Sequence, residues 1–80
     1  MSGWKGVFAI MMEQIKLRED YIKLGQALKA AGFVESGVDA KNDIVNGRVK
    51  VNGSVELQRG KKLYDGDMVE YKGNQIKIIK

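Results

Sequence analysis

The spacing of apolar residues in the middle of the chain predicts a first helix. From about Asp20 onward, apolar side chains recur every three or four residues, at Leu24, Ala27, Leu28 and Ala31. This spacing places them on one face of a helix. Gly32 follows at the point where a residue in the left-handed conformation commonly ends a helix. The first helix is therefore expected to stop at Gly32.

A second helix is expected between Ser36 and Gly47. The Ser36 side chain can accept a hydrogen bond from the amide of Asp39, and the Asp39 carboxylate suits the positive end of the helix dipole. Ala40 and Ile44 then fall on the inward face, and Gly47 ends the helix. The two helices together predict a compact helix-turn-helix unit.

Alternating apolar and polar residues predict strands on both sides of the helix pair. Residues 13–17 alternate before the first helix, and residues 48–51 and 55–57 flank the dipeptide Asn52-Gly53 after the second. Asn-Gly between alternating segments is a strong signal for a hairpin. A three-residue loop ending on Gly53 would pair Val49 with Val55 on one face, so this register is expected in preference to a two-residue loop.

A last hairpin is predicted near the C-terminus. Asp65-Gly66 is a turn signal, and after it Val69 and Tyr71 alternate in step with Ile76 and Ile78 around Gly73-Asn74. With the preceding elements, this predicts an α+β fold. Its expected architecture is a two-helix helix-turn-helix packed on a small antiparallel β-sheet of hairpins.

Length and composition restrict the function. The chain has 80 residues and contains no cysteine, histidine or proline. This length suits one domain, predicted at residues 13–80, with residues 1–12 as an N-terminal extension. Without histidine and cysteine the chain lacks the commonest general base, the best nucleophile and the usual zinc ligands. We therefore expect no enzyme, no cofactor and no metal, and the absence of cysteine fits the reducing cytoplasm.

Positive charge is concentrated in one part of the chain. The formal net charge is +4. Between Lys41 and Lys62 there are six basic residues, which are Lys41, Arg48, Lys50, Arg59, Lys61 and Lys62, and two acidic ones, Asp43 and Glu56. This segment alone accounts for an excess of four positive charges, and the rest of the chain is balanced. Such a segment is either a solvated basic face or a surface that binds phosphates.

Four motifs in order give residues 22–71 a resemblance to the S-four RNA-binding domain, also called the alpha-L motif. They are IKLGQAL from Ile22, SGVDAK from Ser36, GRVKVNG from Gly47 and DGDMVEY from Asp65. The family usually has Arg-Leu-Asp where this chain has Lys-Leu-Gly at 23–25, and Arg where it has Gly37. The glycine variant and the short length are similar to the stand-alone bacterial subgroup of the YaaA/YbcJ type.

The resemblance implies that the helix pair and the following turn contact RNA. By position, the RNA-binding residues expected from it are Lys23, Lys29, Ser36, Lys41, Arg48, Lys50 and Asn52, with Arg59, Lys61 and Lys62 added from the basic connector. Several of these cations are expected to line one groove beside the amides at the start of the second helix, which are suited to bind phosphate.

The implied partner is structured RNA, in particular ribosomal RNA, bound by a monomer associated with ribosome assembly or translation. Most aromatic residues lie outside the basic segment, whereas single-strand stacking platforms place aromatic and basic residues together. Recognition of RNA shape is therefore expected, with Tyr64 beside Lys61 and Lys62 as the one exception. The alternative function is a protein-interaction module with a solvated basic face, such as a ribosome-associated or ubiquitin-like adaptor.

Overall fold

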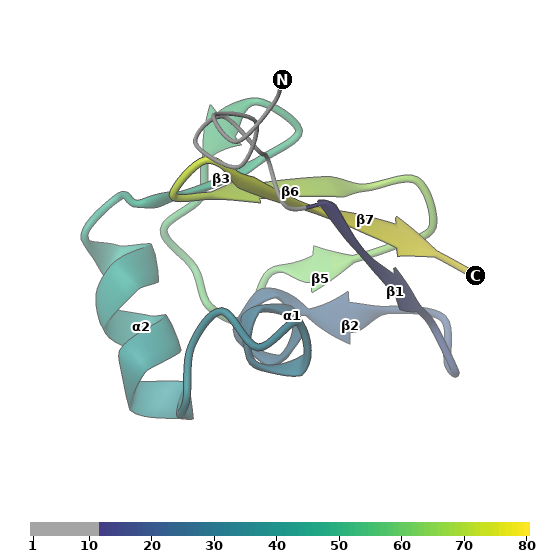
Figure 1. Cartoon of the computed structure of the whole chain (residues 1–80), viewed down its shortest axis with the longest axis horizontal. Coiled ribbons are helices and arrows are strands. Elements are labelled where there is room, and N and C mark those ends of the chain that lie inside the picture. The colour runs from purple at the N-terminus through teal and green to yellow at the C-terminus, as the bar shows by residue number, and fades with distance from the viewer. Residues whose placement is uncertain (1–11) are drawn as a thin grey trace, which may run out of the picture.

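Two helices pack on one face of a five-stranded sheet in the computed structural model of this chain (Figure 1). The structure describes residues 12–80. The elements in chain order are β1 (Met12–Lys16), β2 (Ile22–Lys23), α1 (Leu24–Ala30), α2 (Gly37–Val45), β3 (Val49–Val51), β4 (Ser54–Val55), β5 (Lys62–Leu63), β6 (Met68–Tyr71) and β7 (Asn74–Ile79). The predicted extension at residues 1–12 lies outside the described residues except for Met12, which begins β1.

The five-stranded sheet has the order β1-β7-β6-β3-β4, and β2 and β5 form a separate two-stranded sheet. Both helices and the β2–β5 sheet lie on the same side of the larger sheet (Figure 1). The α+β class and the helix pair packed on a sheet are thus confirmed. None of the helices in residues 12–80 is long and apolar enough to cross a membrane.

The larger sheet is mixed, which corrects the expectation of a wholly antiparallel one. Strand β1 runs parallel to β7, with Met12 opposite Gln75 and Lys16 opposite Ile79, whereas the other strand pairs within residues 12–80 are antiparallel. Turn signals in a sequence report only antiparallel neighbours joined by short loops. A parallel pair is joined by a long crossover, which here comprises nearly the whole domain.

The predicted register of the β3–β4 hairpin is wrong. Lys50 pairs with Val55 and Val51 with Ser54, which leaves a two-residue loop. Asn52 and Gly53 both have positive φ, 52° and 86°, as a type I′ turn requires. The three-residue loop was preferred because it pairs Val49 with Val55 on one face, but Val55 is 52% exposed on the edge strand. Pairing it with buried Val49 would therefore gain little.

The helix boundaries differ in how well they were predicted. Ser36 accepts a hydrogen bond from the Asp39 amide (3.2 Å) and Gly47 adopts φ of 76°, so both ends of the second helix are confirmed. The first helix ends before Gly32 (φ of 78°) as expected, but it begins at Leu24 and not near Asp20. Residues 22–23 instead form β2, which pairs with β5.

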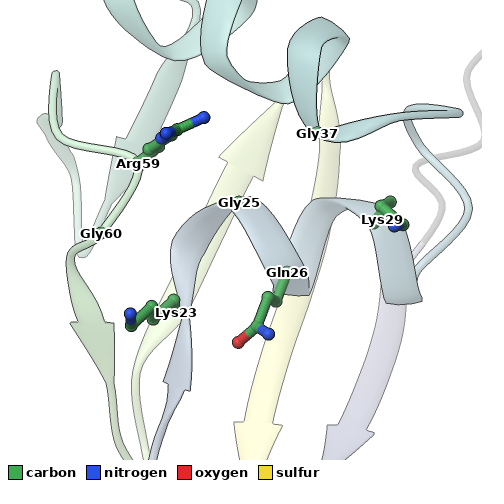
Figure 2. A pocket seen from close by; sticks show the side chains of 7 residues that line it. All are labelled: Lys23, Gly25, Gln26, Lys29, Gly37, Arg59 and Gly60. Atoms are coloured by element: carbon green, nitrogen blue, oxygen red, sulfur yellow. The ribbon is translucent and has the colours of Figure 1, made fainter.

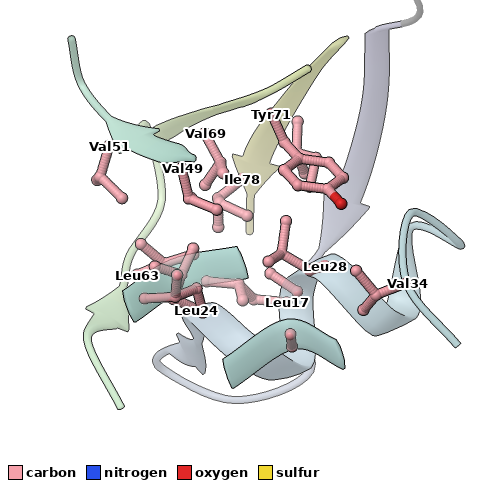
Figure 3. Packing of buried hydrophobic residues seen from close by; sticks show 14 residues of the cluster. Leu17, Leu24, Leu28, Val34, Val49, Val51, Leu63, Val69, Tyr71 and Ile78 are labelled. Atoms are coloured by element: carbon pink, nitrogen blue, oxygen red, sulfur yellow. The ribbon is translucent and has the colours of Figure 1, made fainter. Parts of the chain in front are cut away.

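The core lies between the helices and the inner face of the sheet. Leu24, Leu28 and Leu63 pack there under the sheet residues Val49, Val69 and Ile78 (Figure 3). Ala40 and Ile44 of α2 are fully buried in the same cluster, as predicted. Because the helices cover only this face, residues that alternate with the core positions on the strands, such as Lys50, point to the opposite face.

Candidate functional site

A hollow lies where the start of α1, the start of α2 and the loop before β5 meet (Figure 2). We call it the basic hollow. Its volume is about 320 Å³, and it is lined by Lys23, Gly25, Gln26, Lys29, Gly37, Arg59 and Gly60. Three of these residues are cationic, and none of the described residues that line it is acidic. The basic hollow is therefore an electrostatically favourable place for an anion.

Glycines make much of the surface of the basic hollow. A Cβ atom added at Gly37 or Gly60 would have no neighbour within 4 Å, so both positions are open. A Cβ atom at Gly25 would lie 3.6 Å from the Arg59 carbonyl oxygen and 3.9 Å from Ala40 Cβ, which is ordinary contact. Where side chains are absent, a ligand can approach the backbone closely.

The start of α2 supplies the polar end of the basic hollow. Gly37 is the first residue of this nine-residue helix, and the Ser36 hydroxyl satisfies the amide of Asp39. The preceding amides, of Gly37 and Val38, belong to the first turn, where a helix has no internal partners for its N–H groups. These amides and the positive end of the helix dipole favour an anion beside Gly37.

The start of α1 has a different role, because its first amides hold the loop that carries Arg59. The amide of Leu24 donates to the Lys61 carbonyl oxygen (2.8 Å), and the amide of Gly25 donates to the Arg59 carbonyl oxygen (3.0 Å). In addition, Lys23 is the cross-strand partner of Lys62. These contacts bring cations that are far apart in the sequence, Lys23 and Arg59, to the same hollow.

The structure places the ten predicted site residues in separate regions. Lys23, Lys29 and Arg59 line the basic hollow, and Ser36 precedes Gly37 at its edge. Lys61 and Lys62 continue from Arg59 along the loop and β5, and Lys41 is exposed on α2. The remaining three residues, Arg48, Lys50 and Asn52, lie outside the basic hollow.

The expected groove was to be lined by Lys23, Lys29, Lys41, Arg48 and Lys50. Only Lys23 and Lys29 of these five line the basic hollow, so this part of the prediction is wrong. Arg48 and Lys50 line a separate, smaller hollow with Glu70 and Lys72. Arg48 also forms an ion pair with Asp43, with 3.7 Å between Nη1 and Oδ1. The reason for the separation is the alternation of β3, which buries Val49 against the helices and turns Lys50 to the other face of the sheet.

The side chain of Asn52 links the turn between β3 and β4 to the turn that precedes β6. Its side-chain nitrogen donates to Asp67 Oδ1 (3.0 Å), and its side-chain oxygen accepts from the amide of Met68 (3.0 Å). The backbone amide of Asn52 also donates to the Met68 carbonyl oxygen (2.8 Å). The side-chain groups by which Asn52 was expected to contact RNA are thus already used within the fold.

Sequence reasoning missed four residues that line the basic hollow: Gly25, Gln26, Gly37 and Gly60. A signal existed for Gly25 and Gly37, since the resembled family usually has side chains with charge at both positions. Gln26 also gave a signal, because it lies three residues from both Lys23 and Lys29 on the predicted first helix. Gly60 gave none, because its place in the site depends on the pairing of β2 with β5, which are about forty residues apart in the chain.

These features define a small α+β module with a basic hollow between two helices, and comparison with known proteins gives its family. A family model described as S4 domain matches residues 15–79. The chain belongs to the S4 domain family, as the motifs indicated.

Two curated proteins and one solved structure are similar to this chain over most of its length. "Putative RNA-binding protein YbcJ" of Escherichia coli (strain K12) is 34% identical over 62 residues, which are 78% of this chain and 89% of that protein. "Probable ribosome maturation protein RlbA" of Bacillus subtilis (strain 168) is 41% identical over 63 residues, which are 79% of this chain and 89% of that protein.

The solved structure is the solution structure of E. coli YbcJ, described as revealing an alfaL motif involved in RNA binding. It is 29% identical to this chain, covers 90% of both chains and gives a TM-score of 0.65. The fold, the helix pair on the sheet included, is therefore shared with this relative.

Proposed function

We propose that this chain binds structured RNA through the basic hollow and contributes to ribosome maturation. The observation that carries the proposal is the meeting of Lys23, Lys29 and Arg59 with the first turn of α2, without an acidic side chain among the described lining residues. Phosphate is the anion that this arrangement fits, because it accepts hydrogen bonds from cationic side chains and from helix amides together.

The names of the relatives support the same function. One is named as an RNA-binding protein and another as a ribosome maturation protein. Neither name describes an enzyme, and we infer that this chain acts by binding and not by catalysis. Ribosomal RNA is the partner that unites the two names, and the cytoplasm is the compartment in which ribosomes of bacteria mature. We propose that the chain acts there as a monomer.

Binding is expected to be salt-dependent. If four to six cations of this chain contact phosphates, the slope of the logarithm of the affinity against the logarithm of the salt concentration should be about −3 to −5. Fluorescence anisotropy of labelled ribosomal RNA fragments, at several salt concentrations, measures this slope. A single-stranded RNA without structure is the control. The proposal predicts tighter binding to the structured fragment.

Two charge reversals locate the interface. Lys23→Glu changes a cation that lines the basic hollow, and Lys50→Glu makes the same change in charge on the other face of the sheet. We expect Lys23→Glu to weaken binding at low salt by roughly tenfold or more and Lys50→Glu to have a much smaller effect. Both side chains are exposed, so the unfolding midpoints of the two variants should match that of the unmodified chain.

Other outcomes would point elsewhere. An equal loss in both variants would show that net charge and not the basic hollow determines affinity. Equally weak binding to both RNAs would reject RNA as the partner and favour the protein-interaction module.

Association with ribosomes is tested separately, by sedimenting the chain with ribosomal particles from growing cells. Co-sedimentation that Lys23→Glu abolishes is the expected result, and no co-sedimentation would reject the ribosomal role.

A further inference from the structure

A second hollow adjoins the basic hollow and has a different chemistry. It has a volume of about 400 Å³, within the range of about 300–1,000 Å³ typical of small-ligand sites. Leu17, Tyr21 and Ile22 supply apolar surface, Lys16 and Arg18 supply positive charge, and Gln26 lines both hollows. We call it the Tyr21 groove. A ligand that extends past Gln26 can occupy the basic hollow and the Tyr21 groove together.

The ring of Tyr21 is exposed yet held in place. Tyr21 as a whole residue is 37% exposed, and its ring centroid lies 6.0 Å from that of Tyr64 at an interplanar angle of 53°. The ammonium of Lys62 lies 4.8 Å from the Tyr21 centroid, within the range of a cation–π contact. A ring that is already restrained loses little conformational freedom when a ligand stacks on it.

Tyr64, which supports Tyr21, is itself fixed by a turn. Its amide donates to Asp67 Oδ2 (2.7 Å), and its carbonyl oxygen accepts from the amide of Asp67 (3.0 Å). Tyr64 follows Leu63, which is fully buried. Position and orientation of the tyrosine pair are thus determined by the fold, although 48% of Tyr64 remains exposed.

We propose that the Tyr21 groove binds an unpaired base of the RNA, which stacks on Tyr21 while the neighbouring phosphate lies in the basic hollow. This inference rests on the proposed function and adds a second site to it. Unstacked bases in RNA loops and bulges commonly stack on tyrosine rings and form hydrogen bonds along their edges. The Gln26 amide offers one donor group and one acceptor between the two hollows.

The charges around the groove favour a nucleotide over an uncharged aromatic ligand. Lys16 and Arg18 lie along the groove, Lys62 lies over the ring, and Glu19 is the one acidic residue among the described residues that line it. Aromatic and basic residues are therefore interleaved here. The sequence hid this arrangement because Tyr21 and Tyr64 are far apart in the chain and meet only through the pairing of β2 with β5.

The test uses RNA hairpins that carry the fluorescent base 2-aminopurine. In one hairpin this base is bulged and unpaired, and in a second it is paired within the stem. Stacking of 2-aminopurine on an aromatic ring quenches its fluorescence. We expect the unmodified chain to bind the bulged hairpin more tightly than the paired one and to quench its emission.

Two substitutions of the same residue separate stacking from other effects. Tyr21→Phe keeps the ring and should retain both the preference and the quenching. Tyr21→Leu keeps an apolar side chain without a ring, so it should lose the quenching. It should also weaken binding of the bulged hairpin by about 5- to 150-fold, as expected for loss of one base–aromatic stack. Its salt slope should not change, because no cation is removed.

The control is Val55→Thr, which alters an exposed apolar residue on β4, at the edge of the sheet opposite β1. It should bind both hairpins like the unmodified chain.

The thermal midpoint shows whether Tyr21→Leu is folded. If the folded variant bound and quenched the bulged hairpin normally, the Tyr21 groove would be rejected, whereas RNA binding by the basic hollow would not. If the unmodified chain bound both hairpins equally and without quenching, recognition would be of shape alone. Failure to bind either hairpin would reject the proposed function and the groove together.

Discussion

The hydroxyl of Tyr71 on β6 donates a hydrogen bond to the carboxylate of Asp43 on α2. The contact joins the sheet to the second helix beside the core, and Tyr71 is only 4% exposed. Burial and the neighbouring Asp43 charge raise the pKa of Tyr71 from 10.0 to about 12. Removal of the proton would place two negative charges side by side in a partly buried site.

This raised pKa predicts a loss of stability at high pH. The folded state holds the proton more tightly than the unfolded state, so the contribution of Tyr71 is complete below about pH 10 and disappears as the pH rises towards 12. Tyr71→Phe should lower the free energy of unfolding at neutral pH by about 1.5–3 kcal/mol, because a hydrogen bond to a charged group is lost.

Urea unfolding of both chains between pH 7 and the alkaline limit measures this difference. The stability gap between the unmodified chain and Tyr71→Phe should narrow as the pH rises through the interval from about 10 to 12. Tyrosinate absorbance supplies a second measurement, in which the substitution should remove a step near pH 12. A gap that does not depend on pH would mean that Tyr71 contributes packing alone.

The Asn52 side chain is predicted to stabilise the folded state through its hydrogen bonds. Asn52→Ala removes both side-chain hydrogen bonds, to Asp67 and to the Met68 amide, and places alanine at φ of 52°. Asn52→Gly removes the same bonds but tolerates the positive φ. We expect a loss of about 1–2 kcal/mol for glycine and a larger loss for alanine. Urea unfolding measures both, and equal stability of all three chains would show that the side-chain bonds contribute nothing.

The second helix could be predicted from the sequence because its signals are local. Ser36, Asp39 and Gly47 lie at its ends, and each acts through its own conformation or through a bond to a residue three positions away. The predicted start of the first helix was wrong because residues 22–23 form β2, which pairs with β5 much later in the chain. Propensity and spacing near Asp20 contain no information about that pairing.

The candidate site was predictable in composition but not in arrangement. The cations at 23, 29 and 59 were all proposed from the sequence, yet their meeting depends on bonds from the Leu24 and Gly25 amides to the distant loop. In the same way, the alternation of β3 was visible, but the exposure of Val55 that decides its register was not. Contacts between distant segments determine both features.

Replacement of glycine by alanine should raise stability at a helical position and lower it at a position with left-handed backbone conformation. At Gly25, which lies within α1, an added Cβ atom would make only ordinary contacts. Gly25→Ala should therefore stabilise the chain by about 0.5–1 kcal/mol, the usual helical difference between the two residues. Gly47 has φ of 76°, so Gly47→Ala should destabilise by about 1 kcal/mol or more. Urea midpoints of the pair test this, and a destabilised Gly25→Ala would mean that α1 packs against Ala40 and Arg59 more tightly than these distances indicate.

Ser36 offers a way to separate stability from phosphate binding, because its hydroxyl caps α2 directly before Gly37 in the basic hollow. Ser36→Ala removes the cap and should cost about 1 kcal/mol in the free energy of unfolding. Ser36→Asp replaces one good N-cap with another, so stability should change little. Its carboxylate, however, would occupy the positive end of the helix that we propose for phosphate, and it would repel that phosphate.

The two Ser36 variants should therefore have opposite effects: one should lower stability and leave RNA affinity nearly unchanged, and the other should lower RNA affinity and leave stability nearly unchanged. Ser36→Ala should be less stable to urea but bind structured RNA nearly as well as the unmodified chain when both are folded. Ser36→Asp should be as stable as the unmodified chain but bind the same RNA several-fold more weakly at low salt, with a smaller deficit at high salt because the repulsion is screened. Unchanged RNA affinity in Ser36→Asp would place the bound phosphate away from the start of α2 and leave Lys23, Lys29 and Arg59 as the remaining contacts.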